Sequence, residues 1–140
     1  MIKQRPAVIP TKIIDDFLEA PQLWRYFALK QEFFVDDVSN FPGKFSKPLQ
    51  DLNVNLFHSI AGKIIQHLQG YNHFQDLQIA FRLADKSFGE GWIHHDDPKF
   101  NVAGLIYLND TPPENSGTIF YNQIFENLKS YEDYKFQEFS

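Results

Sequence analysis

The sequence predicts an α+β protein, with helices in its first half and an antiparallel sheet after them. Apolar residues recur every three or four positions from Pro48 to Leu68, which is the spacing of a helix with one buried face. From Leu77 to Leu83 they alternate with polar or small residues, as in a half-buried strand. Because the helices precede the strands instead of alternating with them, the order favours an antiparallel sheet.

Two helices are expected in the first half of the chain. The earlier one follows Pro21, a residue that suits the first helical turn because an N–H group has no partner there. Its apolar residues at helical spacing are Leu23, Trp24, Phe27 and Ala28. The later one is the long helix over residues 48–68, with Ser46 available to cap its start and Gly70 its end.

Further strands are expected after the half-buried one. The seven residues Val102–Leu108 are apolar almost throughout, which predicts a strand buried on both faces. Thr118–Tyr121 predicts another strand after a loop rich in Pro, Gly and Asn. The last nineteen residues, Asn122–Ser140, contain neither Gly nor Pro, and we consider a helix there.

The chain reads as one domain, because no repeat and no linker divides its 140 residues. We expect a mainly helical part at residues 1–75, a β-rich part at 76–121 and an aromatic, acidic tail at 122–140. The tail aromatics are too many to leave in water, so we expect them to pack on the domain or on a second subunit.

Composition excludes several classes of function. The net charge of -5 offers no basic field for a nucleic-acid backbone, so no nucleic-acid partner is expected. The absence of Cys excludes disulfides, thiolate nucleophiles and Cys-ligated metals. The N-terminus lacks the apolar run of a signal peptide or a membrane span, and we therefore expect a cytoplasmic protein without a membrane partner.

One short stretch carries residues that suit chemistry. In a strand, His94 and Asp96 project to one face and His95 and Asp97 to the other. An imidazole and a carboxylate at i and i+2 are two parts of the facial triad that holds non-haem Fe(II). The same spacing fits a metal-free structural pair in which His94 hydrogen-bonds Asp96. Trp92 shares their face, where it forms either a pocket wall or part of the core.

Three segments together resemble 2-oxoglutarate- and Fe(II)-dependent oxygenases of the prolyl-hydroxylase type. They are His94–Pro98, Ala103–Asn109 and Ser116–Tyr121, which match an H-x-D motif, an apolar strand ending in Tyr-Leu-Asn and a Gly-Thr turn. Ile14–Leu18 looks like the entry segment of an uncharacterised group in this superfamily. The resemblance implies N-terminal helices packed on a partial double-stranded β-helix, a jelly-roll or cupin-like sheet. It also implies Fe(II) bound by His94 and Asp96, 2-oxoglutarate as co-substrate, and a hydroxylation reaction.

Two residues are candidates for contact with the co-substrate. The resemblance implies that the Tyr107 hydroxyl donates to the 2-oxoglutarate carboxylate. A core Tyr with a satisfied hydroxyl is the structural alternative. Arg82 faces away from the apolar residues of its strand, and it could reach an anionic co-substrate only if that face lined the cavity.

The sequence departs from the oxygenase pattern after the first two ligands. No His follows His95, and the cations beyond Lys99 are Lys129 and Lys135, so the distal His and the basic 2-oxoglutarate anchor have no counterpart. We expect a chain truncated before the distal His, rather than a degenerate member, and no turnover by the chain alone.

A non-catalytic jelly-roll module for self-association or partner binding is the alternative function. Missing strands would leave unpaired strand edges, which recruit other chains, so a homodimer is expected in either case. The substrate, a peptide or a small metabolite, stays open.

Overall fold

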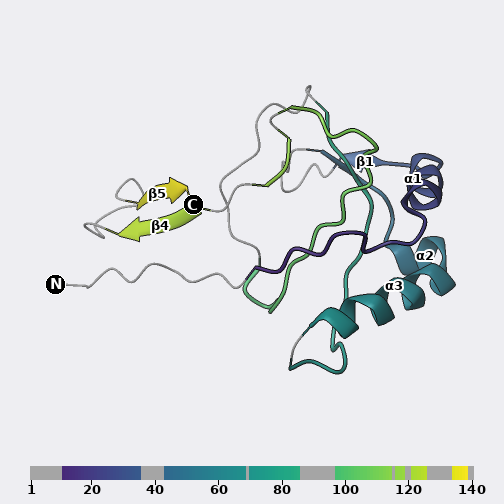
Figure 1. Ribbon diagram of the computed structural model, residues 1–140, viewed down its shortest axis with the longest axis horizontal. Helices are drawn as coiled ribbons and strands as arrows, with labels where there is room; N and C mark the ends of the chain where they lie inside the picture. The colour runs from purple at the N-terminus through teal and green to yellow at the C-terminus, as the bar shows by residue number, and fades with distance from the viewer. Residues whose placement is uncertain are drawn as a thin grey trace. The chain divides into compact units, whose positions relative to one another are not determined.

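A computed structural model describes residues 11–35, 43–68, 70–85, 97–114 and 116–118, together with the backbone of 121–125 and 134–138 (Figure 1). The chain divides into two compact units. One comprises residues 23–94, and the other comprises residues 1–22 and 95–140. The single domain and the boundaries at 75/76 and 121/122 that composition suggests stay predictions. None of the described helices is both long enough and apolar enough to cross a membrane.

Helix α1, Pro21–Leu29, begins at the proline that the sequence predicts for its first turn, so this prediction is confirmed. The single helix predicted over residues 48–68 is wrong. It is divided into α2, Leu49–Leu52, and α3, Val54–His67. Asn53 stands between them in extended backbone, and its Oδ1 accepts a hydrogen bond of 3.0 Å from Leu56 N–H. Asn favours this capping role over the interior of a helix, because its short side chain competes for backbone groups.

Both predicted caps of the long helix, Ser46 and Gly70, are wrong. Ser46 does not cap it, because Pro48 stands at the N-cap of α2, without a side-chain hydrogen bond. Beyond the end of α3, Gly70 has a φ of +84°, a conformation that glycine adopts without steric cost. The C-cap of α3 is Leu68, in extended backbone, so Gly70 follows the cap and does not form it.

A three-stranded antiparallel sheet lies in the unit formed by residues 23–94. Its order is β1, Phe34–Val35, then β2, Lys44–Phe45, then β3, Arg82–Leu83. Only the last two residues of the strand predicted over 77–83 pair in this sheet. The segment before β3 lies beside the residues that follow β2. Two hydrogen bonds join them, from Ser46 N–H to Phe81 O (3.0 Å) and from Leu49 N–H to Ile79 O (2.8 Å).

The apolar core of this unit is small. Ala28 of α1, Leu49 of α2 and Ile60 of α3 are buried, with exposed fractions of 7%, 1% and 3%. The rings of Phe27 and Phe81 meet edge to face, with centroids 5.9 Å apart. α1 and α2 therefore contact the segment that leads into β3.

Ser46 is the buried polar side chain beside this core. Its hydroxyl accepts a hydrogen bond from Phe81 N–H at 3.0 Å and donates one to Lys47 O at 2.8 Å. Both hydroxyl functions are thus satisfied, as burial of a polar group requires. Ser46 joins the turn before α2 to the segment that precedes β3.

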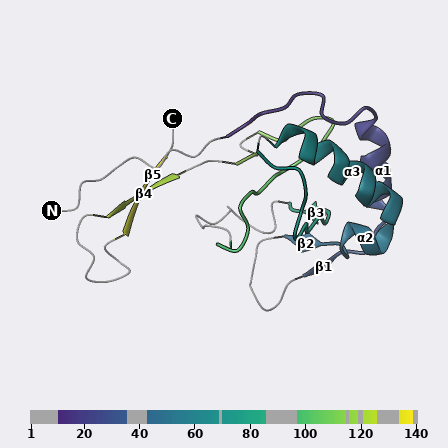
Figure 2. The same ribbon diagram turned by 90° about the horizontal axis from the view of Figure 1, so that it is seen from below.

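In the other unit, the chain forms an antiparallel pair of strands near its end. β4, Tyr121–Phe125, pairs with β5, Tyr134–Glu138 (Figures 1 and 2). A helix over residues 122–140 is therefore wrong for the described part of the tail. Aromatic and β-branched residues favour extended chain. β4 contains Tyr121, Ile124 and Phe125, and β5 contains Tyr134 and Phe136. A strand is predicted over residues 118–121, and β4 starts at the last of these residues. Residues 119 and 120 lie outside the described ranges.

Residues 102–108 differ most from expectation. They form no strand, and residues 102–107 are exposed. A strand buried on both faces needs partners at its edges and cover on its faces, and the described residues supply no backbone partner. The double-stranded β-helix implied by the resemblance stays a prediction.

Candidate functional site

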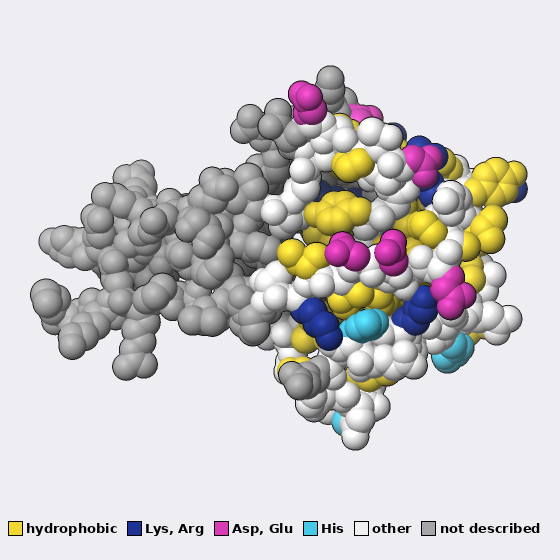
Figure 3. Space-filling model, in the orientation of Figure 1, with side chains coloured by type: hydrophobic (Ala, Val, Ile, Leu, Met, Phe, Trp, Pro, Cys, Tyr) yellow, Lys and Arg dark blue, Asp and Glu magenta, His cyan; other side chains and the backbone are white. Residues whose placement is uncertain are grey.

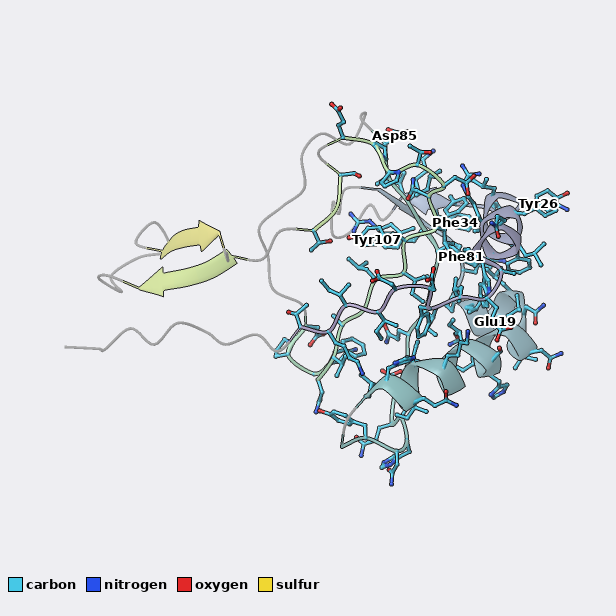
Figure 4. All side chains as sticks on the ribbon, in the orientation of Figure 1. Glu19, Tyr26, Phe34, Phe81, Asp85 and Tyr107 are labelled. Atoms are coloured by element: carbon cyan, nitrogen blue, oxygen red, sulfur yellow. The ribbon has the colours of Figure 1, made fainter. Side chains whose placement is uncertain are left out.

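Two hydroxyl groups from separate segments meet in the unit formed by residues 1–22 and 95–140. Tyr107 Oη and Thr118 Oγ1 lie 2.7 Å apart, within hydrogen-bond distance. The pair is exposed, and the Tyr107 side chain, labelled in Figure 4, is 61% exposed. The structure thus joins two of the three segments that carry the oxygenase resemblance.

A tight turn places Thr118 for this contact. Ser116 donates twice to Pro113 O, from its backbone N–H at 3.2 Å and from its Oγ at 2.6 Å. Gly117 then adopts a φ of +121°, which a residue with a side chain rarely reaches. Thr118 follows directly, so its position depends on a glycine that the local backbone requires.

The hydroxyl pair can bind a ligand oxygen. Each hydroxyl is both a donor and an acceptor, and the bond between them uses one of their two protons, so the other can be donated to an incoming carboxylate oxygen. Water reaches the phenol, so a small solute can reach it too. The exposure of Tyr107 also argues against the alternative of a core Tyr with a satisfied hydroxyl.

The predicted metal ligands His94 and Asp96, and the predicted pocket residue Trp92, lie outside the described residues. Their roles therefore stay predictions. The described chain resumes at Asp97, whose Oδ1 accepts from Lys99 N–H at 3.0 Å and whose carbonyl accepts from Phe100 N–H at 3.0 Å. The Asp97 carboxylate thus serves a local turn, a common use of Asp.

The donor chemistry of the chain fits an Fe(II) site in part. His94 and Asp96 supply a nitrogen and an oxygen, which are two of the three protein ligands of a facial triad. Among the described residues, no group of three or more His, Asp or Glu is arranged to hold a metal ion. The metal site therefore stays a prediction based on His94 and Asp96 of the sequence.

Arg82 is an exposed residue of β3 in the unit formed by residues 23–94. Its guanidinium carbon lies 5.9 Å from the centroid of the Phe45 ring on the neighbouring strand, a cation–π contact across the sheet. This contact gives Arg82 a structural role, and the proposed contact with an anionic co-substrate stays a prediction.

Sequence reasoning did not identify Thr118 as a partner of Tyr107, although it placed Thr118 at the start of a strand. The Gly-Thr dipeptide is the only local signal, and it does not say which residue the threonine meets. The position of Ser46 before a helix predicts a cap, because its hydrogen bond to Phe81, 35 residues away, has no local signature in the sequence.

Comparison with known proteins gives a family and no function. No curated protein and no solved structure matches the chain. A family profile described as a family of unknown function (DUF6445) matches residues 5–140, which is nearly the entire sequence. The chain therefore belongs to the DUF6445 family.

Proposed function

We propose that this chain is a domain of the 2-oxoglutarate- and Fe(II)-dependent oxygenase class, in which His94 and Asp96 bind the metal and Tyr107 contacts the co-substrate. The order of the H-x-D, Tyr-Leu-Asn and Gly-Thr motifs along the chain supports this assignment. The contact between Tyr107 and Thr118 carries it furthest.

That contact brings together residues that the resemblance draws from two different motifs. Tyr107 belongs to the Tyr-Leu-Asn segment and Thr118 to the Gly-Thr turn. Their hydroxyl groups are exposed, so the phenol can exchange its threonine partner for a carboxylate oxygen. Hydrogen bonds to charged groups contribute about 1.5–3 kcal/mol, which is enough to orient a small dianion.

The metal-binding part of the proposal depends on His94 and Asp96. A bound Fe(II) ion would supply the oxygen chemistry of this class, and these two residues would hold it and leave positions open for other ligands. His94 and Asp96 are two of the three usual protein ligands, so the role proposed for them is to bind the metal.

Mn(II) titration of the full chain tests the metal site. Mn(II) is a redox-silent substitute for Fe(II), and its free ion is counted directly by electron paramagnetic resonance. We expect one Mn(II) per chain, with affinity lowered about tenfold or more by His94→Ala, since even residues that only orient a ligand contribute 10–100-fold. His73→Ala is the matched control, because His73 is an exposed residue bonded to Asn72.

The co-substrate contact has its own test. We expect 2-oxoglutarate to tighten Mn(II) binding, and Tyr107→Phe to reduce this tightening about tenfold while leaving Mn(II) binding without 2-oxoglutarate unchanged. Tyr71→Phe, at a tyrosine that is 47% exposed in the other unit, should change neither. Absence of stoichiometric Mn(II) binding would refute the proposal and favour the non-catalytic module.

A further inference from the structure

The segment from Val102 to Leu108 has a surface and a backbone without partners in the described structure. Its sequence is Val-Ala-Gly-Leu-Ile-Tyr-Leu, without a charged residue. Four of its side chains are strongly exposed: Val102 47%, Leu105 60%, Ile106 42% and Tyr107 61%. Within the described ranges, no backbone group of residues 102–108 forms a hydrogen bond, and the polar contact of the segment is the one between Tyr107 and Thr118.

Such a segment is unfavourable in water as it stands. Contiguous exposed apolar residues are rare in soluble monomers, and an apolar run with unpaired N–H and C=O groups is a template for another strand. Hydrophobic side chains reach the surface on the face drawn in Figure 3. The segment therefore suits a partner that brings an uncharged, extended chain.

We propose that residues 102–108 pair with the same segment of a second copy of this chain, as antiparallel strands related by a two-fold axis at Leu105. In this register, the residue numbers of each opposed pair add up to 210. Leu105 of one copy therefore lies opposite Leu105 of the other copy. The interface is self-complementary, as two-fold symmetry requires.

The residue order supports this register and this occupant. Each small residue faces a large one, and the segment is bounded at equal distance from Leu105 by two Asn residues, which face each other. The opposed pairs are Asn101 with Asn109, Val102 with Leu108, Ala103 with Tyr107, and Gly104 with Ile106. A slip by one residue in either direction would end this matching and set an Asn amide against an apolar residue, Val102 in one direction and Leu108 in the other.

The distribution of charge also supports a second copy of the chain as the partner of this segment. The chain carries a net charge of -5, so most surfaces of two copies repel each other. Residues 101–109 contain no charged side chain, and the proposed ladder opposes no like charges. This inference is independent of the proposed oxygenase function, because it involves neither a metal nor 2-oxoglutarate.

Single-cysteine variants test the register, since the chain has no Cys of its own. Opposed Cα atoms in an antiparallel pair lie about 4.5–5.5 Å apart, within the range of about 4.4–6.8 Å that a disulfide spans. Leu105→Cys should therefore form a disulfide-linked dimer under mild oxidation. Val102→Cys is the matched control, because its two copies would lie about 20 Å apart along the strands and should not cross-link.

A mixture of two cysteine variants gives a second test of the register. Val102→Cys chains mixed with Leu108→Cys chains should give the mixed disulfide in excess over either symmetric one. Equal cross-linking of the Leu105 and Val102 variants, or no cross-linking of the Leu105 variant, would overturn the proposed register.

Light scattering of the full chain tests the association itself. We expect a concentration-dependent mass approaching twice 16.4 kDa. Leu105→Lys should return it to one chain, because two positive charges would meet at the axis. Ile13→Lys, at a residue that is 86% exposed in the same unit, should leave the dimer intact. Circular dichroism checks that both variants fold, and a wild-type monomer at all concentrations would overturn the proposal.

Discussion

Leu49 is the most deeply buried of the described side chains in the core of residues 23–94. It is 1% exposed, and its N–H group donates to Ile79 O, a bond that Ala can also make. Leu49→Ala therefore removes side-chain volume without removing this hydrogen bond. Buried Leu→Ala changes cost about 2–5 kcal/mol, and a whole domain has about 5–15 kcal/mol of stability. We expect a loss of about 3 kcal/mol, which lowers Tm by about 12–24 °C in a unit of this size.

Urea and thermal unfolding, followed by far-ultraviolet circular dichroism, measure this loss. Val54→Ala is the control, because Val54 begins α3 and is 52% exposed, so its truncation should cost less than about 0.5 kcal/mol. Equal effects of the two substitutions would refute the reasoning, because they would mean that Leu49 is not in a packed core.

Substitutions at three further positions test local features of the same unit by the same unfolding measurements. Asn53→Ala should cost about 1 kcal/mol by removing the cap of α3, while Asn53→Asp should retain most of the stability. Gly43→Ala should destabilise by more than about 1 kcal/mol, because φ is +121° there and the added Cβ would lie 3.1 Å from Leu83 O. Ser46→Ala should cost about 1–3 kcal/mol, because it leaves the Phe81 N–H without its hydroxyl acceptor. A cost near zero at any of these positions contradicts the role assigned to it.

The helices could be predicted from the sequence because their signals are local. Pro21 marks the first turn of α1, and apolar spacing covers α2 and α3. The break at Asn53 could not be found from that spacing, since Leu49, Leu52 and Leu56 continue the apolar stripe across it. A capping side chain such as that of Asn53 interrupts a helix by hydrogen bonding to the backbone. The spacing of apolar residues gives no sign of this hydrogen bond.

The sheet and the site depend on contacts between distant residues, which periodicity leaves open. The run from Val102 to Leu108 is apolar enough for a buried strand, but burial needs neighbours that the run itself does not specify. In the same way, Tyr107 could be selected by resemblance, whereas its contact with Thr118 depends on the turn at Gly117. His94 and Asp96 stay predictions from the sequence alone.

The two proposals place different demands on Tyr107, and they are compatible. In an extended chain, neighbouring strands join through backbone N–H and C=O groups in the plane of the sheet, while side chains project from its faces. A second copy would therefore use the backbone of residues 102–108 and leave the Tyr107 hydroxyl with Thr118 or with a carboxylate. It follows that Tyr107→Phe should weaken the effect of 2-oxoglutarate without changing the cross-linking of Leu105→Cys. Loss of both together would mean that the phenol holds the segment in shape, and that the co-substrate effect is secondary to this structural role.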